Sequence, residues 1–115
     1  MKISFFGTKR AEPFEKKYIK NRLKKHNLLF FTDNINEENI KKAKNSDIIS
    51  VFINSNINKE VLKNFPKLRM ITTRSTGFDH IDLKSCKRRK IIVSNVTFYE
   101  ENTVAEHKFE LILKL

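Results

Sequence analysis

The sequence is poor in cysteine, glycine and proline: one Cys, two Gly and two Pro occur in 115 residues. The single Cys86 excludes an internal disulfide and a cysteine-rich metal site, and fits a reducing, cytoplasmic location. Gly7 and Gly77 are separated by 69 residues, so the chain has no Gly-x-Gly-x-x-Gly turn to hold a dinucleotide pyrophosphate. No apolar run approaches the ~20 residues that span a bilayer, and we expect neither a signal peptide nor a membrane partner.

Acidic residues are also scarce, and the formal net charge is +11. Such a charge attracts polyanions, so a nucleic-acid-binding α/β domain is one hypothesis. Lys supplies 18 of the 24 basic residues, however, whereas Arg is the better reader of bases and phosphates. Lys17, Lys20, Lys24 and Lys25 fall on one side of a predicted helix, where lysines are normally solvated. A solvated surface is therefore favoured over a nucleic-acid partner.

Short apolar runs alternate with amphipathic stretches along the whole chain. The runs predict strands at 2–6, 28–32, 48–53, 69–73 and 91–94, and the amphipathic stretches predict helices at 12–25, 37–45, 59–64, 83–87 and 102–115. Asn36 is placed to cap the second of these helices. Because parallel strands need crossovers and helices supply them, the pattern predicts a flavodoxin-like three-layer α/β fold with a five-stranded parallel sheet of order 2-1-3-4-5.

In such a sheet, ligands bind at the carboxyl ends of the strands. Gly77 lies in the loop that follows the predicted fourth strand, where we expect it to have positive φ and to let a ligand approach bare backbone. Successive loop N–H groups hold a carboxylate without a charged side chain. The alternative is a plain turn in which Asp79 and Asp82 are turn and cap residues. The loop alone does not decide between the two interpretations.

The remaining reactive side chains form no recognisable catalytic or metal-binding set. His26, His80 and His107 are the only imidazoles, and their spacing matches neither a base–acid pair nor a metal site. We interpret them as surface or packing residues. Basic neighbours could lower the pKa of Cys86, but an ordinary helix cysteine is the favoured interpretation.

Three segments taken in order resemble the first lobe of the D-isomer-specific 2-hydroxyacid dehydrogenases, such as D-lactate dehydrogenases. These segments are RSTGFDHIDL at 74–83, IVSNV at 92–96 and NTVAEH at 102–107. The resemblance covers the whole chain and is most specific after Arg69. Two positions depart from the family pattern: Thr97 replaces the usual Pro, and Glu100 replaces a common Gly or Ser.

The resemblance implies the roles of several residues. The backbone at Thr76 and Gly77 would bind the substrate carboxylate, Tyr99 would line the substrate pocket, and Thr76 and Thr103 would contact NAD. Residues 1–101 would form the substrate lobe, and residues 102–115 would begin the interdomain helix. The catalytic His, its acid and the substrate-binding Arg would lie after Leu115, with most of the NAD site, in a domain that this chain lacks.

The resemblance therefore implies an NAD-dependent oxidoreductase that interconverts a D-2-hydroxy acid and a 2-oxo acid, and it implies that the 115-residue chain alone is inactive. The alternative within the same family is a non-enzymatic binding or regulatory remnant of this lobe. The helix predicted at 102–115 has apolar residues on several sides. We expect it to meet the missing lobe or a second copy of the chain, and we expect the isolated chain to self-associate.

Overall fold

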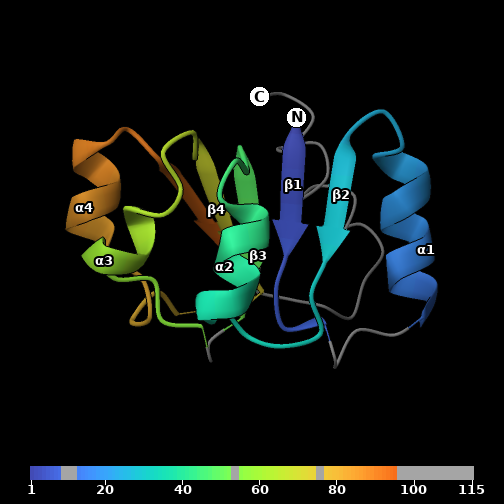
Figure 1. The fold of residues 1–115 in the computed structure, drawn as a ribbon, viewed down its shortest axis with the longest axis horizontal. Coiled ribbons are helices and arrows are strands. Elements are labelled where there is room, and N and C mark those ends of the chain that lie inside the picture. Colours follow the sequence, from blue (N-terminus) through green and yellow to red (C-terminus); the bar gives the residue numbers. More distant parts are fainter. Residues whose placement is uncertain (9–12, 53–54, 75–76, 96–115) are drawn as a thin grey trace.

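The computed structural model describes residues 1–8, 13–52, 55–74 and 77–95. A five-stranded sheet forms its centre (Figure 1), with β1 (Lys2–Phe5), β2 (Asn27–Phe30), β3 (Ile48–Val51), β4 (Met70–Thr73) and β5 (Ile92–Asn95). All paired strands are parallel, in the order β2-β1-β3-β4-β5. This confirms the fold class and the strand order predicted from the sequence.

Helices connect the successive strands. They are α1 (Pro13–Arg22), α2 (Glu37–Ala43), α3 (Lys59–Leu62) and α4 (Leu83–Arg88). None of the helices in these described ranges is long and apolar enough to cross a membrane. The helix predicted at 102–115 lies outside the described residues.

The two faces of the sheet carry separate apolar clusters, because neighbouring residues of a strand point to opposite faces. On one face, Ile49 and Ile71 pack with residues of α2, α3 and α4. On the other, Ile3, Ile48 and Met70 pack with Leu23 and Ile19 from the end of α1. Both faces of the central strands are therefore covered, as the continuous apolar run predicted for the third strand requires.

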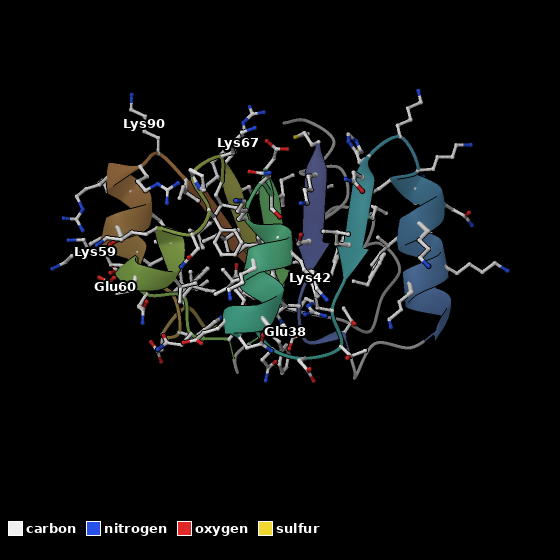
Figure 2. The ribbon with its side chains drawn as sticks, in the orientation of Figure 1. Glu38, Lys42, Lys59, Glu60, Lys67 and Lys90 are labelled. Carbon is white, nitrogen blue, oxygen red and sulfur yellow. The ribbon has the colours of Figure 1, made fainter. Side chains whose placement is uncertain are left out.

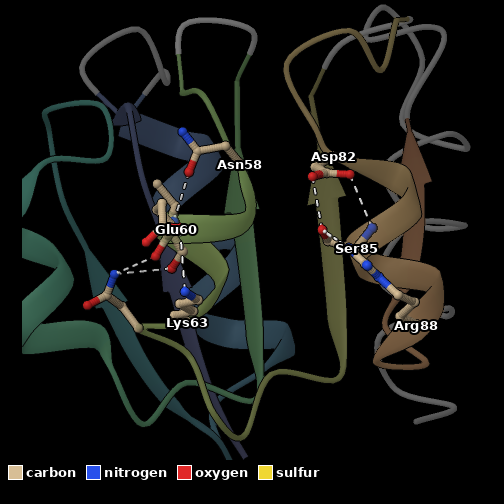
Figure 3. Close-up of polar contacts among 8 residues, drawn as sticks. Asn58, Glu60, Lys63, Asp82, Ser85 and Arg88 are labelled. Carbon is tan, nitrogen blue, oxygen red and sulfur yellow. Dashed lines mark hydrogen bonds and ion pairs between the residues drawn. The ribbon is translucent and has the colours of Figure 1, made fainter.

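Helices α2, α3 and α4 begin at polar caps that the sequence supplies. Asn36 accepts a hydrogen bond from the backbone N–H of Asn39 at 2.8 Å, and the Asn39 side chain accepts one from the Asn36 N–H at 2.8 Å. This reciprocal capping box satisfies two backbone donors and confirms the predicted cap. Asn58 and Asp82 accept hydrogen bonds at the starts of α3 and α4 in the same way (Figure 3).

Two buried hydroxyl groups lie on the same face of the sheet as Ile48 and Met70. Ser50 and Thr72 are paired in register across β3 and β4, and each is 1% exposed. The hydroxyl oxygens of both residues have no hydrogen-bond partner among the described residues. A buried, unpaired hydroxyl is destabilising, so these two residues weaken the sheet at this point.

Candidate functional site

The loops that follow β1, β3 and β4 meet at one edge of the sheet, because all five strands run in the same direction. In this strand order, β1 and β3 are neighbours whose chains continue toward opposite sides of the sheet. That junction is where doubly wound α/β sheets bind ligands. The candidate site is therefore the edge formed by the carboxyl ends of these strands.

Gly7 shapes the loop that follows β1. Its φ is 68°, a left-handed conformation typical of a tight turn, and its N–H donates to the carbonyl oxygen of Asp33 at 2.7 Å. A Cβ at this position would lie 2.8 Å from Oδ1 of Asn34. The backbone conformation therefore favours glycine here, and a larger residue would also displace the Asn34 side chain.

Arg74 places a positive charge at the junction between β1 and β3. The residue directly follows β4, and its backbone N–H donates to the carbonyl oxygen of Val51 at 2.8 Å. Its side chain donates to the same oxygen from Nε at 3.4 Å, and to the carbonyl oxygen of Phe6 from a terminal nitrogen. The half-buried guanidinium thus holds the ends of β1 and β3 beside β4. An anion bound at this edge would meet a fixed positive charge.

Gly77 lies on the exposed part of the loop between β4 and α4. Among the described residues, and apart from its neighbours in the chain, Gly77 has no atom within 4 Å of the position that a Cβ would occupy, so this side of the backbone is open to a ligand. One expectation was wrong: among the described glycines only Gly7 has positive φ. The loop at Gly77 does not need a residue in the left-handed conformation. A side chain at this position would be exposed and not buried.

The far side of this loop is attached to the rest of the fold. Ile81 forms an isolated parallel bridge with Ile57, in the connection between β3 and α3. The Ile57 N–H donates to the carbonyl oxygen of His80 at 2.7 Å, and the Asp82 N–H donates to that of Ile57 at 2.8 Å. Asp82 then caps α4 (Figure 3) by accepting from both the backbone and the hydroxyl of Ser85. These two hydrogen bonds lower the pKa of Asp82. Asp82 is therefore a cap residue.

His80 completes the attachment through its ring. Its Nε2 lies 2.8 Å from the hydroxyl oxygen of Thr73, the last residue of β4. Partial burial lowers the pKa of His80 below 6.5, although the nearby Asp79 carboxylate raises it. The ring is partly buried and packs within the fold, which agrees with the interpretation of His80 as a surface or packing residue.

Cys86 is 1% exposed within α4. Burial raises the pKa of its thiol. The hypothesis of a reactive, low-pKa cysteine is therefore wrong, and the ordinary helix cysteine is the correct interpretation. Among the residues that the structure describes, no three His, Cys, Asp or Glu side chains gather where they could hold a metal ion.

In α2 the charged residues follow the direction of the helix, with Glu37 and Glu38 in the first turn and Lys41 and Lys42 in the last. Lys67 and Lys90, which precede β4 and β5, project from one end of the molecule, whereas Glu38 and Glu60 lie in the first turns of α2 and α3 (Figure 2). Acidic residues at helix N-termini and basic residues at C-termini complement the helix dipoles. The lysines predicted to lie on one side of α1, including Lys17 and Lys20, are exposed. This arrangement favours the solvated-surface interpretation of the net charge.

The structure thus places one predicted site residue, Gly77, at the expected edge of the sheet. Thr76, Tyr99 and Thr103 lie outside the described residues. Sequence reasoning missed Arg74 and Thr73, which take part in the long-range contacts described above. Their position at the end of a buried strand could have identified them in the sequence. An arginine directly after such a strand needs partners for its charge.

Comparison with known proteins identifies relatives of this chain. Residues 6–109 match the family profile described as D-isomer specific 2-hydroxyacid dehydrogenase, catalytic domain. A "2-hydroxyacid dehydrogenase homolog" from Haemophilus influenzae is 32% identical over 119 residues, and the match covers 100% of this chain and 35% of the relative.

Two solved structures are similar to this chain. A D-lactate dehydrogenase from Aquifex aeolicus, in complex with NAD and lactic acid, has a TM-score of 0.73 and 34% identity, over 98% of this chain and 33% of that one. A 3-phosphoglycerate dehydrogenase from Entamoeba histolytica, bound to NAD⁺, has a TM-score of 0.74 and 28% identity, over 84% of this chain and 32% of that one. The chain spans about a third of the length of these relatives.

Proposed function

The chain belongs to the D-isomer specific 2-hydroxyacid dehydrogenase family, and we propose that it is the substrate-binding lobe of an enzyme that interconverts a D-2-hydroxy acid and a 2-oxo acid. In the proposed reaction, a 2-oxo acid, NADH and a proton give a D-2-hydroxy acid and NAD⁺. The observation that carries the proposal is the exposed Gly77 at the carboxyl edge of the sheet, in a chain that matches the catalytic domain of this family.

The backbone of the Gly77 loop would hold the substrate carboxylate. We propose that the N–H groups of Thr76 and Gly77 donate to it, because successive loop N–H groups bind anions without a charged side chain. The open space at Gly77 supports this role, since a carboxylate needs close access to the backbone. Arg74 adds a positive charge at the same edge, and its hydrogen bonds to Phe6 and Val51 keep that charge in place.

NADH would donate the hydride in the reduction of the 2-oxo acid, and NAD⁺ would accept it in the reverse reaction. From this chain, we propose that Thr76 and Thr103 contact the cofactor and that Tyr99 lines the substrate pocket. We assign residues 1–101 to the substrate lobe and residues 102–115 to the start of the interdomain helix.

Most of the machinery is proposed to lie in a second lobe, encoded after Leu115. Relatives about three times as long as this chain support that division. The chain has no Gly-x-Gly-x-x-Gly turn, and His80, beside the loop, has its Nε2 within hydrogen-bonding distance of Thr73. We therefore assign proton transfer and pyrophosphate binding to that lobe, and expect residues 1–115 alone to show no turnover.

The test is NADH oxidation by the complete product of the gene, with pyruvate, glyoxylate, 2-oxoisocaproate and phosphohydroxypyruvate as substrates. Turnover of at least one of these supports the proposal, and the substrate with the highest kcat/KM identifies the class. Tight binding of oxamate, a pyruvate analogue, without turnover of any of the four would favour a non-enzymatic remnant of the same lobe.

A further inference from the structure

The connections that follow β1 and β2 are joined at the carboxyl edge of the sheet, toward which both strands point (Figure 1). The Gly7 N–H donates to the carbonyl oxygen of Asp33 at 2.7 Å and links the two connections. A Cβ on Gly7 would lie 2.8 Å from Oδ1 of Asn34. Because glycine has no Cβ, the Asn34 carboxamide lies directly against the backbone of the first connection.

The backbone of Asn34 is held in place, whereas its side chain is exposed. Its carbonyl oxygen accepts from Nδ2 of Asn36 at 3.3 Å and from Nδ2 of Asn39 at 3.0 Å, in the cap of α2. Among the described residues, none forms a hydrogen bond with the Asn34 carboxamide itself. A carboxamide has two donor hydrogens and an acceptor oxygen. Asn34 therefore offers hydrogen bonds to a ligand from a fixed position.

The guanidinium of Arg74 reaches the same place. The position of a Cβ on Gly7 lies 3.7 Å from a terminal nitrogen of Arg74. Hydrogen bonds to the carbonyl oxygens of Phe6 and Val51 hold this guanidinium. Asn34 and Arg74 thus converge on Gly7, at the junction of β1 and β3 where doubly wound sheets bind ligands.

The place where they converge lies at a distance from Gly77 that a substrate can span. Gly77 follows β4, and only β3 separates β4 from β1. Neighbouring strands are about 4.8 Å apart, so the ends of β4 and β1 are roughly 10 Å apart. Pyruvate is shorter than this gap, whereas a five-carbon 2-oxo acid with a hydrogen bond of about 2.9 Å at each end spans it.

We propose that Asn34, together with Gly7 and Arg74, forms a second subsite that binds the distal carboxylate of a 2-oxo diacid such as 2-oxoglutarate. The inference rests on the function proposed above and deepens it by naming the substrate class. The Asn34 carboxamide donates hydrogen bonds to the distal carboxylate, and the positive charge of Arg74 favours an anion over a neutral chain end. The exposed Asp33 carboxylate, next to Asn34 in the chain, opposes this preference.

The test compares two substrates of the complete gene product, 2-oxoglutarate and 2-oxopentanoate, which have chains of equal length and differ only in the distal carboxylate. The readout is the ratio of kcat/KM for 2-oxoglutarate to kcat/KM for 2-oxopentanoate, because a general loss of activity or stability lowers both values and cancels in the ratio. The variants are Asn34→Ala, Asn34→Asp and Asp33→Asn. Asn45→Ala and Asn45→Asp are the matched controls, since Asn45 is also exposed but precedes β3 at the opposite edge of the sheet. The melting temperature of each variant is measured in parallel.

We expect the wild type to prefer 2-oxoglutarate. Asn34→Ala should lower the ratio about fivefold, because it removes a hydrogen bond to a charged group, and Asn34→Asp should lower it more than about tenfold, because it also adds a repelling charge. Asp33→Asn should raise the ratio about threefold, since it removes the opposing charge. Both Asn45 variants should keep the ratio of the wild type.

The proposal is overturned if the wild type reduces 2-oxopentanoate as well as or better than 2-oxoglutarate, if folded Asn34→Ala and Asn34→Asp keep the wild-type ratio, or if the Asn45 variants change the ratio equally. Asp33→Asn carries the test if the Asn34 variants fail to fold, and an unchanged ratio in it then overturns the subsite. A wild type that turns over no 2-oxo acid overturns the function proposed above and this inference with it. A wild type that turns over a 2-oxo acid but shows no preference for the diacid overturns this inference alone.

Discussion

The backbone N–H of Ile91 donates to the carbonyl oxygen of Cys86 over 2.8 Å and so closes the end of α4. A second bond, from the N–H of Lys90 to the carbonyl of Lys87 at 3.1 Å, completes the hydrogen-bond pattern of a Schellman motif. Lys90 has φ 59°, the left-handed conformation that glycine adopts at little cost. The helix therefore ends at Lys90, a residue with a Cβ for which the left-handed conformation is unfavourable.

Replacing Lys90 by glycine should stabilise the fold. A left-handed conformation costs an L-residue roughly 1–2 kcal/mol, so we expect Lys90→Gly to raise the free energy of unfolding by about 1 kcal/mol. The control is Lys87→Gly, an exposed position in the last turn of the same helix, which should lower it by about the same amount. Urea unfolding of the two variants measures both values. A loss of stability in Lys90→Gly contradicts this account of the helix end.

Thr72→Val should also stabilise the fold. The hydroxyl of Thr72 is buried and has no partner among the described residues, and a methyl group of similar size has no such cost. We expect an increase of about 1 kcal/mol in the free energy of unfolding. Ser46→Ala is the contrasting control, since the Ser46 hydroxyl is bonded to both Ser4 and the carbonyl of Ala43 and its loss should be destabilising. If Thr72→Val lowered the free energy of unfolding as much as Ser46→Ala does, the Thr72 hydroxyl would have a hydrogen-bond partner, and the prediction would be wrong.

His80 should make the free energy of unfolding depend on pH below pH 6.5. Its folded-state pKa lies below the unfolded value of 6.5, so between these two pH values the unfolded chain binds more protons. The free energy of unfolding should therefore fall as the pH drops from 6.5 through the folded pKa, and this contribution should be constant below it. His80→Gln should remove this part of the pH dependence, and His26→Gln should not. NMR titration of the His80 ring measures the pKa, and a value above 6.5 would be incompatible with this prediction.

Gly77→Val in the complete gene product should impair turnover and leave the fold intact. The position is exposed, has no positive φ and has room for a Cβ, so we expect little change in melting temperature. A branched side chain would block access to the backbone, and kcat/KM for the 2-oxo acid should fall about tenfold or more. Leu83→Ala, at an exposed position in the first turn of α4, is the control. Unchanged kinetics in the folded Gly77→Val variant would remove Gly77 from the substrate site.

The architecture could be predicted because its determinants are local. Apolar runs and amphipathic stretches identified the strands and helices, and their alternation required a parallel sheet. The boundaries were less accurate. The helix predicted at 12–25 ends at Arg22, since Leu23 begins a turn in which the His26 N–H donates to the Leu23 carbonyl. The strand predicted at 48–53 ends at Val51.

The details of the site depend on contacts that no local pattern encodes. Arg74 reaches the carbonyl of Phe6 across 68 positions in the sequence, and only the assembled sheet brings the two together. The ring of His80 meets Thr73 because the bridge between Ile57 and Ile81 turns the loop back toward β4. The loop sequence identified Gly77 as a ligand-binding candidate, but it gave the wrong backbone conformation, since glycine occurs both in tight turns and in open loops.

The configuration of the product tests the central claim most directly. The complete gene product is incubated with NADH and the 2-oxo acid that it reduces fastest, and the 2-hydroxy acid formed is resolved by chiral chromatography, with residues 1–115 alone as the parallel sample. The account predicts the D-isomer as the single product of the complete protein and no product from residues 1–115. An L-isomer, a racemate, no product from the complete protein, or turnover by residues 1–115 alone would contradict it.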